Sequence, residues 1–174
     1  MIEITERAKK IKLVIFDVDG VLTDGGLYFT AEGTEFKRFN SLDGLGIKIL
    51  RDNGVESAVI TARNSKTVEH RMQNLGIEHY YQGQEDKRVA FQKLLKKLSL
   101  NADEVAYVGD DVIDLPVMTK VGFSVAVANA HEAVKQHADL ITEKLGGHGA
   151  VREVCDFILK AQDKFDKAIK SYLS

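Results

Sequence analysis

The sequence has little of what would cross-link a chain, hold it in a membrane or divide it into several folding units. It contains one cysteine and one proline among 174 residues, so it can form no internal disulfide and offers no proline-rich linker. No apolar run approaches the roughly 18 residues of a membrane span, and residues 1–10 lack the apolar core of a signal peptide. These absences predict one domain over residues 1–174, a cytoplasmic location and no membrane partner.

A strong charge of either sign is also missing. Lysine and arginine number 24, aspartate and glutamate number 26, and the formal net charge is −2. Such a balance gives no overall attraction to nucleic acid or to an anionic membrane, and we expect neither as a partner. The one cysteine, Cys155, is spaced helically with Val151, Val154 and Ile158, a pattern that favours a buried thiol over a reactive one.

What the sequence does contain is a regular alternation of two kinds of segment. Short apolar runs rich in β-branched residues, typical of buried strands, occupy residues 13–16, 58–60, 105–108 and 125–127. Amphipathic segments between them, ending near Gly54, Gly76 and Leu98, are typical of helices. The alternation predicts an α/β fold: a doubly wound, Rossmann-like parallel sheet with helices on both faces, where ligands bind beyond the carboxyl ends of the strands.

Two further patterns predict helices. Asn129, followed three residues later by Glu132, resembles a capping box that opens a helix. Residues 150–172 carry apolar side chains three and four positions apart, which predicts a C-terminal helix over that range.

Residues 26–39 interrupt the alternation and predict an inserted β-hairpin. Two strand-like stretches flank residues 31–33, a short turn that ends in a glycine able to take a positive φ. An isolated hairpin is marginal in water, and the aromatic side chains at positions 28, 29, 36 and 39 need a cover. Contact with another subunit is favoured over packing against the core of the same chain. No segment is long enough to form a large cap domain.

Carboxylates gather directly after two of the predicted strands. Asp17 and Asp19 follow the first strand, and Asp110, Asp111 and Asp114 follow a later one. Such a collection is unfavourable unless a cation or a ligand compensates the repulsion. Magnesium prefers oxygen ligands and needs only a few carboxylates or carbonyls together with a substrate phosphate. Because both groups lie at strand ends of one sheet, we expect them to converge on a Mg²⁺ site.

Groups suited to binding phosphate also follow a predicted strand. Thr61, Ala62 and Arg63 come directly after the strand at 58–60 and offer a hydroxyl, backbone amides and a guanidinium. Lys87 stands early in a later helix, where it could offset negative charge on a nucleophile and a phosphate.

Each of these groups has a plainer interpretation as well. A hydroxyl such as that of Thr61 is common as a helix cap, and a lone lysine such as Lys87 is more often a solvated surface charge. Acids such as Asp111 and Asp114 are favoured at helix N-termini by the helix dipole. The order of the groups along the chain favours the functional interpretation.

That order resembles the haloacid dehalogenase-like phosphohydrolases. Their four motifs occur here as Asp17-Val18-Asp19-Gly20, then Thr61, Lys87, and Gly109-Asp110-Asp111 with Asp114. The resemblance implies that Asp17 attacks phosphorus to form an aspartyl-phosphate and that Asp19 acts as general acid and base. It implies catalytic parts for Thr61 and Lys87 as well. It also implies a Mg²⁺ ion bound by Asp17, the backbone carbonyl of Asp19 and Asp110, with Asp111 and Asp114 in support.

Within that superfamily the chain is similar to the 3-deoxy-D-manno-octulosonate 8-phosphate (KDO 8-phosphate) phosphatases, from about Lys12 to Gln162. The resemblance rests on residues 17–24, the hairpin, and the segments 39–47, 61–71, 81–84, 109–116 and 146–153. It implies a magnesium-dependent phosphatase of lipopolysaccharide core biosynthesis. It also implies a homotetramer in which the hairpins associate and a neighbouring subunit, instead of a cap, roofs each active site.

The resemblance further implies which residues bind the sugar acid: Asn40, Ser41, Asp43, Gly44, Lys48, Arg63, Arg71 and Lys87. Arginine suits both carboxylate and phosphate, although Arg71 could also be a charge on a helix surface. Two positions depart from the family pattern: Leu42 replaces a basic residue found in many relatives, and Ala62 replaces a common glycine. The first bears on the identity of the sugar, and the second keeps its backbone amide. His148, in a glycine-rich loop, fits either a flexible turn or contact with a neighbouring site.

Other functions fit parts of this pattern. A phosphatase for a nine-carbon keto-sugar acid 9-phosphate would share nearly all of the motifs. A phosphoacceptor receiver-like domain, which is not an enzyme, also joins an acidic pocket, a hydroxyl and a lysine. Its acceptor aspartate lies on a middle strand, however, whereas here Asp19 lies two residues from Asp17 and can hydrolyse what Asp17 accepts. A phosphomutase would need a cap to exclude water.

Overall fold

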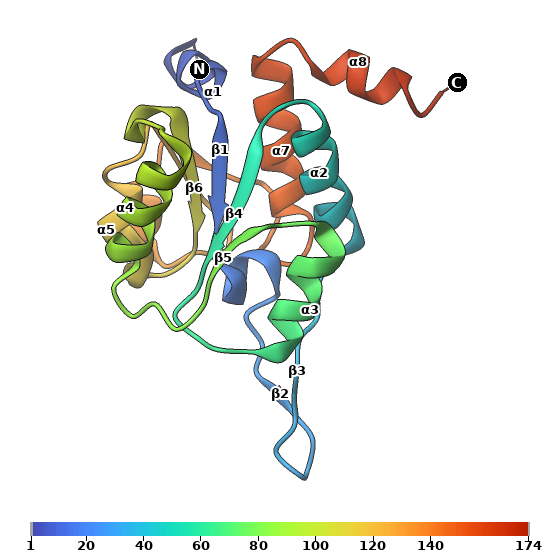
Figure 1. The fold of residues 1–174 in the computed structure, drawn as a ribbon, viewed down its shortest axis with the longest axis vertical. Coiled ribbons are helices and arrows are strands. Elements are labelled where there is room, and N and C mark those ends of the chain that lie inside the picture. The colour runs from blue at the N-terminus through green and yellow to red at the C-terminus, as the bar shows by residue number, and fades with distance from the viewer. Residues whose placement is uncertain (1, 174) are drawn as a thin grey trace.

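The centre of the protein is a six-stranded sheet whose strands all run parallel (Figure 1). The computed structural model describes residues 2–173. Along the sheet the order is β5–β4–β1–β6–β7–β8. The strands are β1 (Leu13–Phe16), β4 (Glu56–Ile60), β5 (His79–Tyr81), β6 (Val105–Gly109), β7 (Phe123–Ala126) and β8 (Leu140–Ile141). The four predicted strands are confirmed, and β5 and β8 are added to them.

Helices cover both faces of this sheet, which confirms the predicted doubly wound α/β fold. On one side lie α2 (Ser41–Asp52), α3 (Lys66–Leu75) and α7 (Ala150–Ala161), and on the other lie α4 (Lys87–Leu98) and α5 (Leu115–Met118) (Figure 1). The first helix, α1 (Ile2–Lys9), packs against α7. Every residue of β1 is buried, which is why that strand is a continuous apolar run. Cys155 on α7 is fully buried as predicted, and burial raises the pKa of its thiol.

The strand order reverses between β1 and β6. From β1 the chain runs outward to β4 and β5, then returns to β6 and continues outward to β7 and β8. In sheets of this kind, ligands bind beyond the carboxyl ends of the strands at such a reversal. Asp17 directly follows β1 and leads into the turn η1 (Val18–Leu22), and Asp110 directly follows β6 and leads toward η3 (Val112–Asp114). The fold therefore brings the two acidic groups to the same place.

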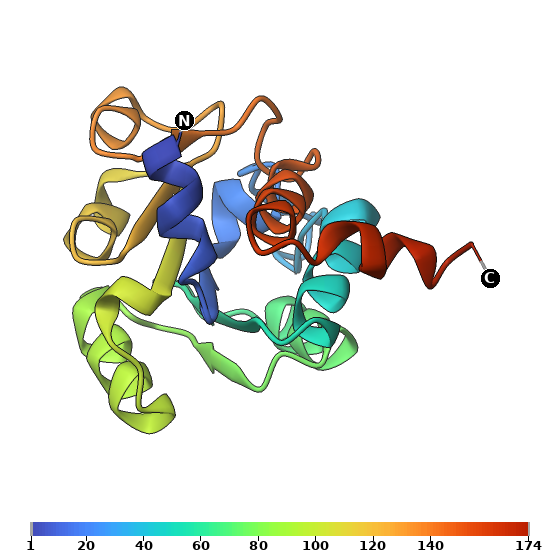
Figure 2. The same ribbon diagram turned by 90° about the horizontal axis from the view of Figure 1, so that it is seen from above.

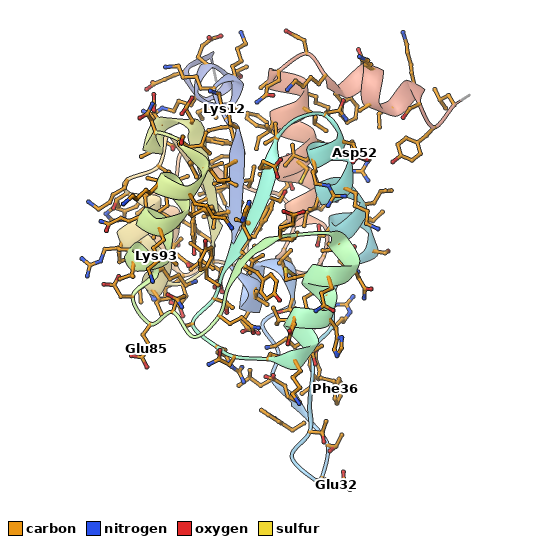
Figure 3. All side chains as sticks on the ribbon, viewed as in Figure 1. Lys12, Glu32, Phe36, Asp52, Glu85 and Lys93 are labelled. Carbon is orange, nitrogen blue, oxygen red and sulfur yellow. The ribbon has the colours of Figure 1, made fainter. Side chains whose placement is uncertain are left out.

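The predicted hairpin is present as β2 (Tyr28–Phe29) and β3 (Glu35–Phe36), and it extends away from the carboxyl ends of the sheet (Figure 1). Gly33 in its turn has a φ of +83°, which glycine adopts without strain. Glu32 lies at the tip, with Phe36 nearer to the body of the molecule (Figure 3). Within residues 2–173 the chain has no large cap domain, as the sequence predicts.

The capping box predicted at Asn129 is wrong. The N-cap of α6 (Glu132–Lys135) is His131, whose Nδ1 accepts the backbone N–H of Ala133 at 3.1 Å. The side-chain oxygen of Asn129 instead accepts the N–H of Gly146 at 2.8 Å. The side chain of Asn129 therefore bonds to a backbone group distant in the sequence and does not cap α6. The remaining short turn is η2 (Ala102–Glu104).

The single helix predicted over 150–172 is instead two helices, α7 and α8 (Phe165–Lys170). The chain turns between them at Asp163, which has a φ of +56°. Gln162 stabilises the break because its side-chain amide donates to the carbonyls of Ala8 and Ile11. Seen from above, α8 projects from the body and leads to the C-terminus (Figure 2). No helix among residues 2–173 is long and apolar enough to cross a membrane.

Candidate active site

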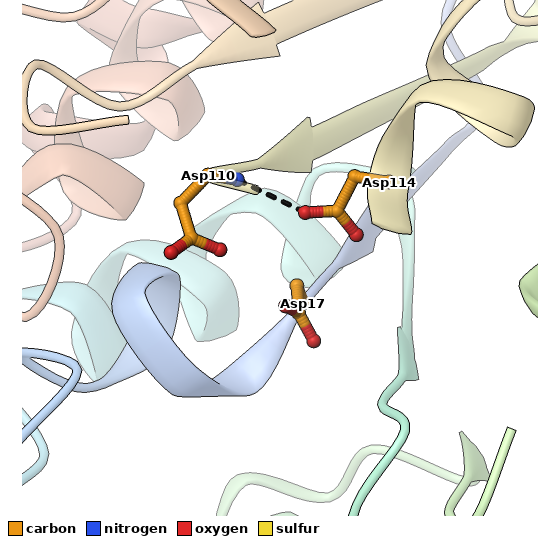
Figure 4. A group of neighbouring side chains, drawn as sticks. All are labelled: Asp17, Asp110 and Asp114. Atoms are coloured by element: carbon orange, nitrogen blue, oxygen red, sulfur yellow. Dashed lines mark hydrogen bonds between the residues drawn. The ribbon is translucent and has the colours of Figure 1, made fainter. Parts of the chain in front are cut away.

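Three carboxylates meet beyond the carboxyl ends of β1 and β6 (Figure 4). One oxygen from each of Asp17, Asp110 and Asp114 lies within 4.8 Å of the others. Asp17 and Asp110 come from the two central strand ends, and Asp114 ends η3. The structure thus brings together the acids that the strand-end pattern places on one edge.

Asp114 is held by protein donors on both of its oxygens. Oδ1 accepts from Nζ of Lys87 at 2.7 Å and from the hydroxyl of Tyr107 at 2.7 Å. Oδ2 accepts the backbone N–H groups of Asp110, at 3.0 Å (Figure 4), and of Asp111, at 3.3 Å. With its lone pairs engaged in this way, Asp114 supports the loop and Lys87 and has little capacity left for a cation.

Asp110 offers a free oxygen at the site. Its Oδ1 is buried and has no hydrogen-bond partner among residues 2–173, a costly arrangement unless a cation binds there. A Cβ on Gly20 would lie 2.0 Å from Oδ2, so only glycine, here with a φ of +88°, lets η1 approach this closely. These features fit a Mg²⁺ ion held by Asp17, Asp110 and the backbone carbonyl of Asp19, which are the oxygen ligands that magnesium prefers.

Burial and crowding disfavour the charged forms of these carboxylates. Burial, together with repulsion from Asp114, raises the pKa of Asp17 to about 7, although Lys87 opposes the rise. Burial, followed by the charges of Asp17 and Asp114, raises the pKa of Asp110 to about 8. A divalent cation would compensate the repulsion and favour both carboxylates.

Lys87 balances the cluster from the side of α4. It is 2% exposed, and its Nζ lies 2.9 Å from Oδ1 of Asp17 and 3.2 Å from the hydroxyl of Tyr107. Burial opposes the ammonium, but the charges of Asp17 and Asp114 outweigh it, so the pKa of Lys87 is raised. Sequence reasoning missed Tyr107. The available signal was a tyrosine in an otherwise aliphatic strand run.

A cavity of 260 Å³ opens in front of the cluster. It is lined by the predicted catalytic and metal-binding residues Asp17, Asp19, Thr61, Lys87 and Asp110, by the predicted supporting residue Asp111, and by Ala62 and Arg63 from the loop after β4. The backbone N–H of Arg63 donates to Oγ1 of Thr61 at 3.4 Å. Residues of the loop after β4 and the acidic cluster therefore line one small space, an arrangement suited to phosphate.

Asp19 lies at this cavity and is held by a lysine that the sequence reasoning did not single out. Nζ of Lys37, directly after β3, lies 2.5 Å from Oδ1 of Asp19 and 3.3 Å from Oε1 of Glu35. Glu35 in turn accepts from Nη2 of Arg63 at 2.6 Å. The alternation Glu35-Phe36-Lys37 was the signal that could have found this lysine, because it puts both charges on one face of a strand.

The other predicted substrate residues do not line the cavity. They are Asn40, Ser41, Asp43, Gly44, Lys48 and Arg71, on or beside α2 and on α3. Asp43 is buried, and its Oδ1 accepts the N–H of Arg152 at the start of α7. Asn40 is the N-cap of α2, whereas Ser41 and Lys48 are exposed. The contact of these residues with substrate stays a prediction.

Arg71 is anchored at the start of α2. Its Nη2 donates to the carbonyl of Asn40 at 3.2 Å, and its guanidinium lies 5.5 Å from the centre of the Phe39 ring. Gly44 permits this approach, because a Cβ there would lie 2.3 Å from Nη2 of Arg71. The interpretation of Arg71 as a mere helix-surface charge does not fit these contacts.

His148 joins the base of the hairpin to the loop before α7. Its Nδ1 lies 2.9 Å from the carbonyl of Gly146 and is the donor there, so Nε2 accepts from Nη1 of Arg38 at 2.9 Å. Arg38 also pairs with Asp24 at 3.6 Å. Within one chain, His148 therefore anchors the base of the hairpin through Arg38.

Comparison with known proteins agrees with this site. Residues 80–154 match the model of the haloacid dehalogenase-like hydrolase family. The chain is 52% identical over 166 residues to the 3-deoxy-D-manno-octulosonate 8-phosphate phosphatase KdsC of Escherichia coli K12. The aligned residues make up 95% of this chain and 88% of that protein. It is 54% identical over 162 residues to the Salmonella typhi protein of the same name, covering 93% and 86%. The crystal structure of the phosphatase from Moraxella catarrhalis, in complex with a magnesium ion, a phosphate ion and KDO, superposes with a TM-score of 0.97 at 47% identity and covers 99% of both chains.

Proposed function

Because the chain belongs to the 3-deoxy-D-manno-octulosonate 8-phosphate phosphatase family of haloacid dehalogenase-like hydrolases, we propose that it hydrolyses KDO 8-phosphate to the free sugar acid and inorganic phosphate. It is a magnesium-dependent phosphatase on the same grounds. The observation that carries the proposed chemistry is the position of Asp17. This carboxylate lies buried between Lys87 and Asp110 and faces the cavity that Thr61 and Arg63 line.

Asp17 is the nucleophile in the first step. Its carboxylate attacks phosphorus, an aspartyl-phosphate bond forms, and the bond between phosphorus and the sugar oxygen breaks. Asp19 gives its proton to that oxygen as it leaves. Lys87, 2.9 Å from Asp17, orients the carboxylate and offsets its charge. Thr61 and the backbone of its loop hold the phosphate oxygens.

Asp19 acts again in the second step, now as a base. Its carboxylate takes a proton from water, the water oxygen attacks phosphorus, and the bond from phosphorus to Asp17 breaks. Inorganic phosphate leaves, and both side chains regain their starting states. Asp17, Asp110 and the backbone carbonyl of Asp19 would hold Mg²⁺, with Asp111 and Asp114 in support. The bound ion supplies neutralisation of charge on the transferred phosphoryl group.

The size of the cavity supports a site completed by a second subunit. Its 260 Å³ falls below the roughly 300–1,000 Å³ of typical ligand pockets, so it suits the phosphate while the sugar acid extends outward. Leu27, Phe29 and Phe36 on the hairpin are 61%, 55% and 51% exposed in the described chain, residues 2–173. We propose a homotetramer whose hairpins associate and whose active sites lie at subunit interfaces.

The start of α2 and the neighbouring part of α3 would face the sugar acid in that assembly. Asn40, Ser41, Lys48 and Arg71 would contact it, Asp43 and Gly44 would shape the surface from beneath, and Arg63 and Lys87 would contact the phosphate end. In this proposal the enzyme works in the cytoplasm of a Gram-negative bacterium and supplies the sugar acid for the lipopolysaccharide core.

Release of inorganic phosphate tests the proposal. The protein is given KDO 8-phosphate with and without Mg²⁺, beside nine-carbon keto-sugar acid 9-phosphates, with Asp17→Asn as the control. We expect magnesium-dependent release from the eight-carbon ester and none from the variant. Preference for a nine-carbon acid would keep the mechanism and replace the sugar. A receiver-like domain would retain phosphate on Asp17 without turnover, and no release from any ester would overturn the enzymatic function.

A further inference from the structure

The hairpin presents two chemically different faces. Because side chains alternate along a strand, Glu35 and Lys37 point away from the face that carries Phe36. Phe36 is 51% exposed and stacks on Tyr28, with ring centroids 5.3 Å apart. The side chain of Lys37, in contrast, is 1% exposed, although the hairpin projects from the body of the molecule (Figure 3). A buried ammonium is costly unless it is paired, so its partners define its part in the structure.

Two carboxylates hold Lys37. Its Nζ lies 2.5 Å from Oδ1 of Asp19 and 3.3 Å from Oε1 of Glu35. The same Glu35 oxygen lies 2.6 Å from Nη2 of Arg63, in the loop after β4. A chain of ion pairs therefore runs from the η1 turn, through the hairpin, to the loop that lines the phosphate cavity.

We propose that Lys37 is a positioning residue for Asp19, so that the hairpin fixes the carboxylate that transfers the proton in the phosphatase reaction. The inference rests on the proposed function, because it concerns the part that Asp19 plays there. With Oδ1 engaged by Lys37, Oδ2 is the oxygen that exchanges a proton with the sugar oxygen and with water. Such transfer needs heavy atoms about 2.6–3.2 Å apart, so a change of one rotamer would take Asp19 out of reach.

Glu35 and Arg63 complete the chain of ion pairs that begins at Asp19. Glu35 provides Lys37 with a second carboxylate besides Asp19, and Arg63 fixes Glu35 in turn. Lys37 stands on the same hairpin that is proposed to join the subunits. Its contacts with Asp19 and Glu35 lie within one chain, so they do not require the subunit contact. In many enzymes the closing of a lid completes the catalytic arrangement, and here an inserted hairpin would do so without a cap.

Direct binding of substrate by Lys37 is the competing interpretation. Lys37 is not among the residues that line the 260 Å³ cavity, whereas Asp19 is, so the carboxylate stands between the ammonium and the reacting atoms. The two interpretations differ in kinetics. Loss of a substrate-binding lysine raises KM, whereas loss of a group that acts only through Asp19 lowers kcat.

Steady-state hydrolysis of KDO 8-phosphate by the magnesium-loaded, assembled enzyme tests the inference. The variants are Lys37→Met, Lys37→Arg and the control Lys93→Met, which removes an exposed lysine of α4 (Figure 3). We expect Lys37→Met to lower kcat on the order of 10- to 100-fold with KM changed by less than about threefold. Lys37→Arg should recover part of the loss, and Lys93→Met should match the wild type. Light scattering and the Tm check assembly and folding of each variant.

A double variant gives a second measurement. If Lys37 acts through Asp19, adding Lys37→Met to Asp19→Asn lowers kcat no further, whereas independent contributions multiply. An unchanged kcat in Lys37→Met, a raised KM with kcat retained, or a multiplied loss in the double variant would each overturn the inference while the wild type remains a phosphatase. No hydrolysis by the wild type would remove the proposed function and this inference with it.

Discussion

Asp110 is a residue at which negative charge is costly in the metal-free protein. Its pKa of about 8 in the folded state lies above the ordinary value of 3.8, so between these pH values the folded protein binds a proton that the unfolded chain has released. Without magnesium, the free energy of unfolding should therefore fall as the pH rises from about 4 to about 8. The pKa of about 7 for Asp17 acts in the same direction.

Asp110→Asn removes this charge and keeps the shape of the side chain. At pH 8 without Mg²⁺ we expect a higher Tm than in the wild type, by about 2–4 °C for each kcal/mol of repulsion removed, and a much smaller difference at pH 5. Magnesium should raise the Tm of the wild type and leave the variant unchanged. Thermal unfolding followed by circular dichroism, at pH 5 and pH 8 and with and without Mg²⁺, measures these differences. Asp103→Asn, at an exposed position, is the control, and a variant less stable than wild type at pH 8 would contradict the electrostatic argument.

Gly20 controls how closely η1 approaches Asp110. The Cβ of an alanine at this position would lie 2.0 Å from Oδ2 of Asp110. The alanine would also have to adopt the φ of +88° that Gly20 has. We expect Gly20→Ala to weaken Mg²⁺ binding on the order of tenfold or more and to lower the free energy of unfolding by about 1–3 kcal/mol. Gly33→Ala is the matched control, because Gly33 has a similar φ of +83° but no neighbouring atom within 4 Å. Calorimetric titration with Mg²⁺ should distinguish the two, and equal affinities would show that the close approach is unimportant.

At the scale of the element, a substitution on the exposed face of the hairpin should weaken subunit assembly but not the folding of a single chain. Phe36→Ser removes a ring that is 51% exposed, so the stability of a single chain should change little. The proposed subunit contact should weaken, and the mass measured by sedimentation should fall below that of the proposed tetramer. KM should rise by about tenfold as substrate contacts are lost. Val89→Ser on α4, 46% exposed and remote from the hairpin, is the control. An unchanged mass at micromolar concentration would count against the tetramer.

Elements were predictable from the sequence where one pattern alone determines them. The run at Leu13–Phe16 is buried on both faces, and its apolar composition identifies it without knowledge of its neighbours. The start of α6 and the break after α7 were not predictable in this way. The N–H of Gly146 donates to the side-chain oxygen of Asn129, and the side-chain amide of Gln162 donates to the carbonyls of Ala8 and Ile11, so distant backbone groups decide both outcomes.

The same division applies to the candidate site. Asp17 and Asp110 could be placed together because parallel strands present their carboxyl ends at one edge. Lys37 and Tyr107 could not, because a lysine on a hairpin and a tyrosine in a strand acquire their acidic partners only through the arrangement of several elements. The exact placement of Asp43 was missed for a similar reason: its partner, Arg152, lies more than a hundred residues away.

At the scale of the whole molecule, residues 1–174 are predicted to form a single domain. Buried apolar residues from Ala8 to Ala168 make one continuous core cluster, which supports this prediction. We therefore expect one cooperative transition in urea at low protein concentration, with coincident curves from tyrosine fluorescence and from far-ultraviolet circular dichroism. Two separated transitions would indicate an independent folding unit and would contradict the prediction.

The two faces of the hairpin also bear on how such a protein can diverge. Phe36 and Tyr28 occupy one face and Glu35 and Lys37 the other. Neighbouring positions in the sequence therefore contribute to two different proposed roles, subunit contact and the positioning of Asp19. Substitutions at alternate positions can then alter the proposed subunit contact without disturbing Asp19, the proposed acid/base residue, or affect Asp19 without altering that contact. A short insertion thereby gives natural selection two nearly independent traits.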